Sequence, residues 1–252
     1  MAKPVALITG AGQRIGSAIA HALAQDGYAV GVHYRSSSTG AGALVESIIE
    51  NGGDAATLQA DLTDRDAVRA LVPACEVALG PVTCLVNNAS VFEKDSIEDM
   101  DDALWDAHMQ MHVHTPITLI GQMAKRLPRG RQAVAINIID QRVWRLTPEF
   151  LSYTLSKSTL WTATRTLAQA LAPSVRVCGI GPGPTLANTR QAPEDFQAQI
   201  DNVILKRGPD LSEITNAVRF ILETPSLTGQ MIALDGGQHL AWETPDVIHA
   251  NE

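Results

Sequence analysis

The sequence predicts a doubly wound α/β fold, in which a parallel sheet of about seven strands carries helices on both faces. Short apolar runs alternate with amphipathic segments along the chain. The runs are apolar throughout, as in strands buried on both faces, rather than at every second position. The 252 residues, of which 45% are hydrophobic, suffice for one large core. We therefore expect a single domain over residues 1–252, ending in a loose tail that starts near residue 242.

Turn and capping residues delimit the expected elements. Gly10 ends the first strand, Thr63 or Asp64 caps the third helix, and Gly80 with Pro81 stops that helix. The expected strands cover residues 5–9, 29–34, 55–60, 82–86, 133–139, 175–180 and 231–234. The expected helices cover residues 13–26, 42–50, 63–79, 102–125, 147–172, 195–205 and 212–222, and residues 181–194 form a loop. Right-handed crossovers then bring the carboxyl ends of the strands to one edge of the sheet.

Charge and composition narrow the functional class. The net charge is −8 and the chain has no cluster of Lys or Arg, which argues against a nucleic-acid surface. No apolar run approaches the roughly 18 residues of a membrane span, and the N-terminus lacks the pattern of a secretory signal, so we expect a cytoplasmic protein. Cys75, Cys84 and Cys178 are odd in number and widely spaced, which indicates buried reduced thiols. We therefore expect chemistry on a small molecule.

A glycine-rich turn joins the first expected strand to the first helix. It contains Gly10, Gly12 and Gly16, with Arg14 and Ile15 before the last glycine. In this strand-turn-helix setting, backbone N–H groups and the helix dipole can hold a pyrophosphate, as in a Rossmann-type fold. A tight turn without a ligand is the alternative interpretation of the glycines.

The end of the second expected strand indicates which dinucleotide binds. It reads His33, Tyr34, Arg35, Ser36, and it offers no acid to bind the hydroxyl groups of the adenosine ribose. Arg35 and Ser36 can instead bind a 2′-phosphate by charge-assisted hydrogen bonds. We therefore predict that NADPH, rather than NADH, is the cofactor. The alternative is a solvated loop with one exposed arginine.

Further candidates follow the third and fourth expected strands. Asp61 and Leu62 follow the third strand, and Asn88, Ala89 and Ser90 follow the fourth. These positions lie at the sheet edge where doubly wound folds bind their ligands, so we expect them to contact the cofactor. Turn chemistry is the alternative, because Asn and Asp bond their own backbone readily.

The strongest candidates for catalysis are Asp140, Tyr153 and Lys157. Asp140 follows the fifth expected strand, and Tyr153 and Lys157 lie one turn apart on one face of the next helix. A nearby ammonium group favours the phenolate, so we expect Lys157 to lower the pKa of Tyr153 and make it a usable acid or base. A Tyr-x-x-x-Lys pair also occurs by chance on amphipathic helices without a catalytic role.

The combined motifs resemble those of the short-chain dehydrogenases/reductases over nearly the whole chain. In chain order they are Thr9-Gly10-x-x-x-Arg14-x-Gly16, Asn87-Asn88-Ala89, Tyr153-x-x-x-Lys157, Pro182-Gly183 and Asp235-Gly236-Gly237. The resemblance implies that Pro182 and Gly183 contact the cofactor and that Lys157 holds the nicotinamide ribose. It also implies a homotetramer, formed through the helix that contains Tyr153 and the helix before it.

Four departures from the general family pattern resemble the pteridine reductases and the bacterial dihydromonapterin reductases. Arg14 replaces a glycine, Asp140 stands where most members have a catalytic serine, Phe92 follows Asn-Asn-Ala-Ser-x, and residues 33–37 end the second strand. This resemblance implies that Arg14 contacts both cofactor and pterin, that Phe92 stacks on the pterin ring, and that Ser90 hydrogen-bonds close to it.

The chemistry of pterin reduction makes these departures intelligible. A ring C=N bond takes a hydride on carbon and a proton on nitrogen, and a flat heterocycle gains from an aromatic wall opposite the nicotinamide, here Phe92. We expect Tyr153 and Asp140 to supply the proton and to titrate with Lys157 as a coupled unit. The predicted activity is NADPH-dependent reduction of a dihydropterin to a tetrahydropterin, with Arg14 and Ser90 as further substrate contacts.

Two other functions remain open from the sequence. One is a carbonyl or 3-oxoacyl reductase of the same family, and the other is a catalytically silent NADPH-binding protein, against which Tyr153 and Lys157 argue. His112 occupies the place of an asparagine that organises a proton-relay water in most members, which leaves that relay in doubt. His108 and His112 lie one helical turn apart, but no nearby Cys or carboxylate completes a ligand set, so we predict no metal.

Overall fold

The computed structural model describes residues 3–187 and 192–242, and it contains one seven-stranded sheet. The strands are β1 (Val5–Ile8), β2 (Ala29–Tyr34), β3 (Ala55–Gln59), β4 (Val82–Asn87), β5 (Ala133–Ile138), β6 (Val175–Pro182) and β7 (Met231–Leu234). Their order is β3-β2-β1-β4-β5-β6-β7, and all neighbouring pairs are parallel. The predicted sheet is confirmed.

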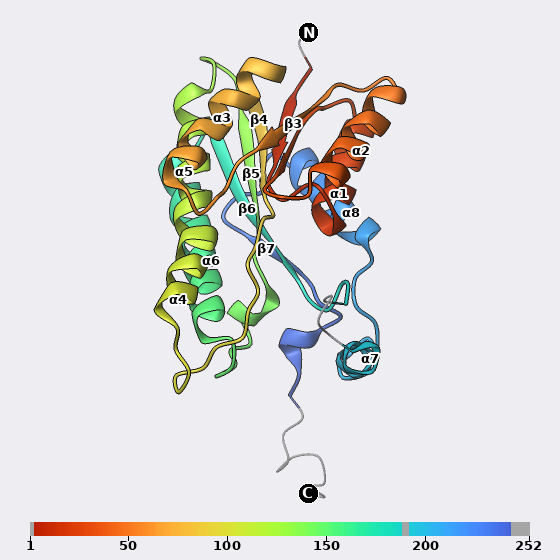
Figure 1. Cartoon of the computed structure of the whole chain (residues 1–252), viewed down its shortest axis with the longest axis vertical. Coiled ribbons are helices and arrows are strands. Elements are labelled where there is room, and N and C mark those ends of the chain that lie inside the picture. The colour runs from red at the N-terminus through yellow and green to blue at the C-terminus, as the bar shows by residue number, and fades with distance from the viewer. Residues whose placement is uncertain (1–2, 188–191, 243–252) are drawn as a thin grey trace, which may run out of the picture.

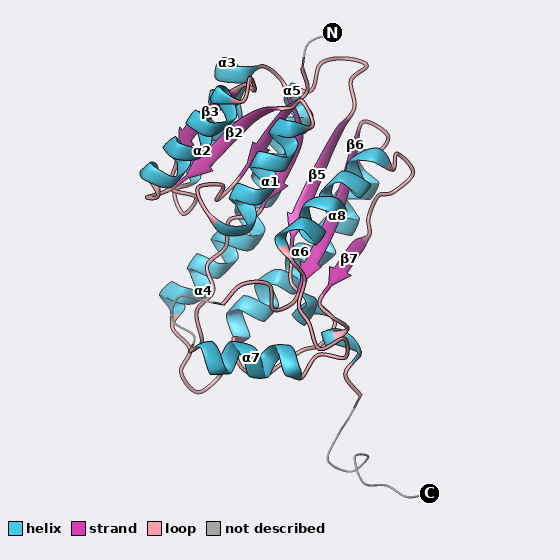
Figure 2. Ribbon diagram, turned by 90° about the vertical axis from the view of Figure 1, so that its right-hand side faces the viewer, coloured by secondary structure: helices cyan, strands magenta, loops and turns pink. Residues whose placement is uncertain are grey.

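Helices cover both faces of this sheet (Figure 1). One face carries α3 (Arg65–Leu79), α4 (Asp102–Met109), α5 (Thr115–Arg126) and α6 (Leu151–Leu171). The other face carries α1 (Arg14–Gln25), α2 (Ser38–Glu50) and α8 (Leu211–Glu223). Helix α7 (Pro193–Asp201) lies apart from both layers, beyond the ends toward which the strands run (Figure 2). Among the described helices, none is both long and apolar enough to cross a membrane.

The strands bury side chains on both faces, which explains why they are apolar throughout. In β1, Val5 and Leu7 belong to the core cluster under α3 and α5, whereas Ala6 and Ile8 belong to the cluster under α1 and α8. All four are at most 1% exposed. The three cysteines are buried and unpaired, as expected.

Side-chain caps fix where several helices begin. The carboxylate of Asp64 accepts hydrogen bonds from the backbone N–H groups of Asp66 (2.8 Å) and Ala67 (3.4 Å) at the start of α3. Helix α8 starts with a capping box between Asp210 and Glu213. Both arrangements satisfy N–H groups that have no partner inside the helix.

The helix expected over residues 102–125 is not one regular α-helix. A π-helical turn, Gln110–His114, separates α4 from α5. The extra residue per turn rotates the faces of the two helices relative to each other, and it buries Met111 and His112 together. Sequence periodicity did not predict this π-helical turn. The residues on both sides of it keep right-handed helical backbone angles, so the segment has the pattern of one continuous helix.

Three further helices have different bounds from those expected. Helix α2 begins at Ser38 rather than residue 42. Helix α6 begins at Leu151 rather than near residue 147, because Phe150 takes a left-handed conformation with φ 57°. The buried carboxylate of Asp95 then accepts from the N–H of Ser152 (3.1 Å). Helix α7 ends at Asp201 instead of residue 205. Residues 188–191 of the predicted loop and residues 243–252 of the predicted tail lie outside the described residues.

The order of the strands determines where a ligand can bind. The chain runs outward from β1 to β2 and β3, then returns to the other side of β1 with β4. In a doubly wound sheet, this reversal opens a crevice at the carboxyl ends of β1 and β4.

Candidate active site

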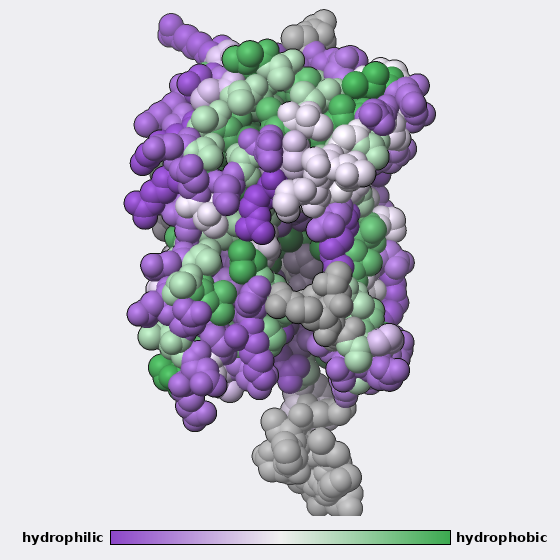
Figure 3. Space-filling view, in the orientation of Figure 1, coloured by the Kyte–Doolittle hydropathy of each residue, from purple (hydrophilic) through white to green (hydrophobic). Residues whose placement is uncertain are grey.

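A pocket of about 370 Å³ lies at the reversal point. In Figure 3 the surface is hollowed near the middle of the face shown, at the level where the strands end. Most of the predicted cofactor residues line this pocket, namely Gly10, Arg14, Ile15, Gly16, His33, Tyr34, Arg35, Ser36, Leu62, Asn88, Ala89 and Ser90. Gln13, Ser37, Val91 and Met111 line it too. Met111 was not a candidate because the π-helical turn is what brings it there.

The glycine turn before α1 is shaped to receive an anion. Gly10 has φ 64°, and a Cβ on Gly16 would clash with the carbonyl oxygen of Gly10 and lie 2.6 Å from Asn88 Nδ2. Gln13, the N-cap residue of α1, makes no side-chain cap. The first N–H groups of the helix are therefore free of a side-chain cap and suit a pyrophosphate.

His33 holds the glycine turn from β2. Its Nδ1 accepts a hydrogen bond from Gly10 N (2.9 Å), and its Nε2 therefore donates to Ala60 O (3.1 Å). The side chain is 2% exposed, and burial lowers the pKa of His33 to about 4. The imidazole is consequently neutral and serves as a support for the turn.

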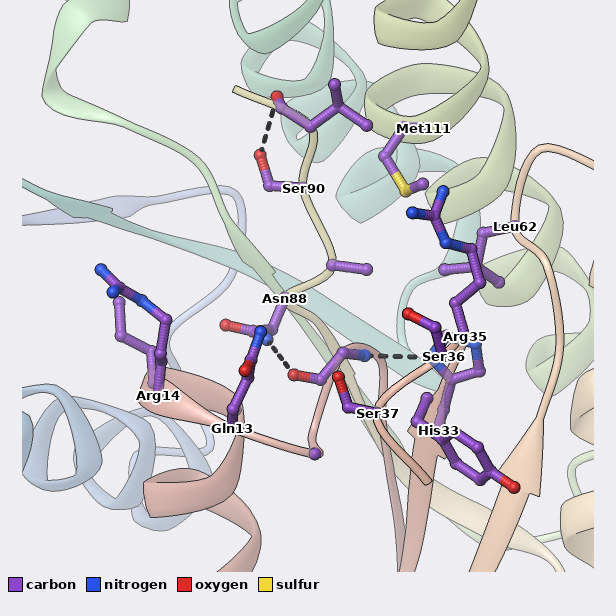
Figure 4. Close-up of a pocket in the computed structure, with 17 residues that line it drawn as sticks. Gln13, Arg14, His33, Arg35, Ser36, Ser37, Leu62, Asn88, Ser90 and Met111 are labelled. Carbon is purple, nitrogen blue, oxygen red and sulfur yellow. Dashed lines mark hydrogen bonds between the residues drawn. The ribbon is translucent and has the colours of Figure 1, made fainter. Parts of the chain in front are cut away.

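Two arginines lie on opposite sides of the pocket (Figure 4). Arg14 donates to the carbonyl oxygens of Leu186 (3.1 Å) and Ala187 (2.9 Å), so it links the glycine turn to the loop after β6. Arg35 is exposed at the end of β2, beside Ser36. No carboxylate in the described part of the chain forms an ion pair with Arg35. Its charge is therefore available to a ligand.

Four predicted cofactor residues do not line the pocket as described. Asp61 accepts hydrogen bonds from the N–H and hydroxyl of Thr63 (2.9 and 2.7 Å), and these lower the pKa of its carboxyl group. This is the backbone-bonding turn that the sequence offered as the alternative role of Asp61. Lys157 lies in the cluster described next. Pro182 ends β6, and Gly183 N donates to Leu234 O (2.8 Å), at the same edge of the sheet.

Asp140, Tyr153 and Lys157 come together as predicted, in a buried cluster beyond β5. The hydroxyl of Tyr153 donates to Asp140 Oδ2 (2.9 Å), and Asp140 Oδ1 accepts from Arg142 N (2.8 Å). The ammonium group of Lys157 donates to Ile138 O (2.9 Å). Tyr153 is 5% and Lys157 2% exposed. Helical spacing and the strand end thus place all three side chains correctly.

The electrostatics of this cluster correct one prediction. The pKa of Tyr153 is raised well above its usual value, first by burial and then by the charge and the hydrogen bond of Asp140. Burial also raises the pKa of Asp140 and lowers that of Lys157 to about 8. The expected lowering of the Tyr153 pKa by Lys157 is therefore wrong for the free protein, because desolvation and Asp140 outweigh it.

Phe92 lies against Tyr153 in an aromatic group that includes a residue the sequence did not suggest. The ring of Phe92 stacks on Phe150 with centroids 4.6 Å apart and meets Tyr153 edge-on at 4.8 Å. The guanidinium of Arg142 lies 5.3 Å from the Phe92 centroid and 4.6 Å from the Phe150 centroid. No sequence signal marks Phe150, because its left-handed backbone sets its position. Arg142 could have been suspected, since it follows Asp140 by two residues.

His112 connects this cluster to the cofactor pocket. Its Nε2 lies 2.9 Å from Ser90 Oγ, and its Nδ1 lies 2.8 Å from Ser156 Oγ. The ring also meets Tyr153 edge-on, with centroids 5.3 Å apart. His112 is 1% exposed, and burial lowers its pKa well below the usual value. The side chain that replaces the expected asparagine is therefore part of the site.

The family of the chain follows from comparison with known proteins. The model of the short chain dehydrogenase family matches residues 4–198. The chain belongs to this family, and it is an oxidoreductase, as the motifs predicted.

Within the family the chain is similar to enzymes named for pterin and folate reduction. The dihydromonapterin reductase of Citrobacter koseri is 31% identical over 237 residues, which cover 93% of this chain and 96% of that protein. FolM alternative dihydrofolate reductase 1 from Brucella suis, in complex with NADP, has a TM-score of 0.94 at 52% identity, over 97% of this chain and 98% of that one. The Brucella canis protein, also complexed with NADP, has a TM-score of 0.95 at 51% identity, over 98% of each chain. The predicted likeness to dihydromonapterin reductases is confirmed.

Proposed function

We propose that the protein catalyses the NADPH-dependent reduction of a dihydropterin to a tetrahydropterin. The observation that supports this most directly is the hydrogen-bonded pair of Tyr153 and Asp140 beside the pocket. The names of the similar enzymes agree with this activity, and the NADP in the Brucella structures agrees with NADPH as the cofactor. The exposed guanidinium of Arg35 is the group that would select the 2′-phosphate.

The chain's own residues divide the reaction between them. NADPH supplies a hydride to a ring carbon, and the neighbouring ring nitrogen must receive a proton. Tyr153 keeps its proton at neutral pH because its pKa is raised, so it can deliver that proton. Asp140 accepts the hydrogen bond of the Tyr153 hydroxyl at rest, and its raised pKa lets it take up a proton from solvent after the transfer and pass it to the Tyr153 phenolate. Lys157 carries a positive charge below about pH 8 and so limits the cost of a transient phenolate.

The polarity of the site favours a pterin over a simple ketone. An ionised carboxylate at residue 140 only accepts hydrogen bonds, whereas a serine hydroxyl in that place could donate to a carbonyl oxygen. A reduced pterin offers ring N–H and amino groups that can donate to such an acceptor. Phe92 adds an aromatic surface beside Tyr153, which suits a flat heterocycle.

The first test is the initial rate of oxidation of NADPH and of NADH, measured separately with dihydromonapterin, dihydrobiopterin, dihydrofolate and a small ketone. We expect turnover with NADPH and at least one pterin, and slower turnover with NADH. Turnover of the ketone without any pterin would instead support a carbonyl reductase. NADPH binding without turnover of any of the four would support a catalytically silent protein.

A second test concerns Asp140 directly. Asp140→Ser restores the serine that most members of the family have, and we expect it to lose pterin turnover and the pH dependence that Asp140 imposes. Asp140→Asn is the matched variant, because it keeps the shape but removes the charge and the titration, and it replaces one acceptor oxygen with an NH2 donor. If Asp140→Ser kept full pterin activity with an unchanged pH profile, the proposed role of Asp140 would be wrong.

We also propose that the protein assembles as a homotetramer through α5 and α6. The outer faces of these helices expose apolar side chains, among them Ile117 on α5 (37% exposed) and Leu155 on α6 (43% exposed). Light scattering coupled to gel filtration measures the mass in solution, and a monomeric mass would contradict the assembly.

A further inference from the structure

We infer that His112 is a positioning residue that accepts the hydrogen bond of the Ser90 hydroxyl, so that Ser90 presents only lone pairs to the substrate. On this basis Ser90 selects a heterocycle that offers an N–H or amino group, and it disfavours a ketone, which can only accept. This inference rests on the proposed function for the identity of the substrate, but the direction of the hydrogen bonds around His112 stands independently of it.

The backbone fixes which nitrogen of His112 carries the proton. The N–H of Val91 points at His112 Nε2, 3.3 Å away. A backbone amide can only donate, so Nε2 must be the unprotonated, accepting nitrogen. In a neutral ring the proton then lies on Nδ1, which donates to Ser156 Oγ at 2.8 Å. Ser156 can accept it because its own proton goes to Tyr153 O at 2.7 Å.

The surroundings keep His112 neutral. The ring is 1% exposed. The charged and titratable groups around it are Lys157, which opposes a second positive charge, His108, whose ring stacks at 5.6 Å, and Tyr153. A proton on Nε2 would also face the N–H of Val91. Protonation of His112 is therefore disfavoured by burial, by charge and by hydrogen-bond geometry together.

This arrangement determines the direction in which the Ser90 hydroxyl donates its hydrogen bond. Its hydroxyl has one proton and two acceptors nearby, His112 Nε2 at 2.9 Å and Val91 O at 3.2 Å. Both acceptors turn the proton back toward His112 and the adjoining loop. Ser90 thus presents lone pairs to a ligand in the pocket that it lines. The hydroxyl proton of Tyr153 is directed away from Ser90, toward Asp140 Oδ2.

Removing the acceptor should reverse the selection. In His112→Leu the Ser90 hydroxyl loses its nearer acceptor and keeps only Val91 O at 3.2 Å, so it can turn toward the substrate and donate, and we expect kcat/KM for the dihydropterin to fall about tenfold, the size of one lost hydrogen bond. We expect the ratio of ketone turnover to pterin turnover to rise. In a Ser90→Ala background, His112→Leu should have no further effect on this ratio, because the hydroxyl that it redirects is gone.

A purely structural role for His112 gives different results. The losses from the two substitutions would then add in the double variant, and the ratio of ketone to pterin turnover would not move. Ser156→Ala supplies a milder variant in case His112→Leu does not fold, because it removes only the acceptor of the Nδ1 proton. We expect the same direction of change with a smaller size, and an unchanged ratio in Ser156→Ala would overturn the inference.

A direct measurement needs no substrate. Nitrogen NMR of the protein labelled at its histidine rings distinguishes protonated from bare ring nitrogens, and His112→Gln identifies the signal. We expect a protonated Nδ1 and a bare Nε2 between pH 6 and 8. A protonated Nε2, or an imidazolium at pH 7, would overturn the inference. If the NMR agrees but no pterin turns over, the proposed function fails while the direction of the Ser90 hydroxyl stands.

Discussion

The cofactor pocket and the catalytic cluster lie at the same edge of the sheet but consist of different kinds of groups. The pocket is framed by a glycine turn and an uncapped helix end, and the charge that Arg35 offers there is exposed. The cluster consists of ionisable side chains that are withdrawn from water, with Tyr153 at 5% and Lys157 at 2% exposure. Charge in water acts weakly, whereas desolvated groups shift the pKa values of one another. Substitutions in the cluster should therefore have larger and more pH-dependent effects.

Tyr153→Phe should give the largest effect. The substitution removes the hydroxyl group, whose proton is the one that residue 153 can deliver. The loss of a general acid typically lowers kcat by about 10²- to 10⁴-fold. The phenyl ring keeps the contacts with Phe92 and His112, so the Kd for NADPH, measured by fluorescence titration, should change little. A kcat within about tenfold of the wild type would show that another group supplies the proton.

Arg35→Ala should have a smaller effect, confined to binding. A lost hydrogen bond to a charged group costs about 1.5–3 kcal/mol, so KM for NADPH should rise by about one to two orders of magnitude while kcat is retained. KM for NADH, which lacks the 2′-phosphate, is the internal control and should stay the same. Equal changes in both Michaelis constants would refute the assignment of Arg35 to the phosphate.

His33 gives the pocket a pH dependence of stability. The unfolded chain binds a proton at His33 near pH 6.5, but the folded protein resists until about pH 4, so stability should fall as the pH falls through this window. Linkage gives a loss of about 3 kcal/mol when both steps are complete. His33→Gln can keep both hydrogen bonds without titrating. Its melting temperature should therefore drop less than that of the wild type between pH 7 and pH 4, and parallel drops would contradict this.

Arg142→Gln should have the smallest effect. Arg142 lowers the pKa values of both Asp140 and Tyr153, so its removal should move the corresponding limbs of the pH–rate profile to higher pH. Arg142 is partly exposed, and such interactions are worth about 0.2–1 kcal/mol, or less than one pH unit. Arg145→Gln is the matched control, because Arg145 contacts Gln238 O instead of the cluster. A shift in the control as large as in the variant would mean that net charge, and not the place of Arg142, is responsible.

The sequence predicted the frame of the site better than its electrostatics. A local glycine pattern is enough to predict the glycine turn. A four-residue spacing is enough to predict that Tyr153 and Lys157 lie one above the other, because both residues belong to one helix. The sign of the Tyr153 pKa shift depends on burial by other elements and on Asp140, so helical spacing gave the wrong direction. The stacking of Phe150 on Phe92 and the contact of His112 with Ser90 depend on a left-handed residue and a π-helical turn. Neither has a signature in the periodicity.

The hydrogen bonds that shape the glycine turn also set the order in which the chain can become functional. Thr9 Oγ1 accepts from the N–H groups of Asn88 (2.9 Å) and Ala89 (3.0 Å), which lie 79 and 80 positions further along the chain. Contacts this distant in sequence require a long loop to close before they can form. During synthesis, at about 5–20 residues per second, the first β-α-β unit emerges several seconds before its partner strand β4. A nascent chain therefore cannot gain stability from NADPH until more than a third of the protein has been made.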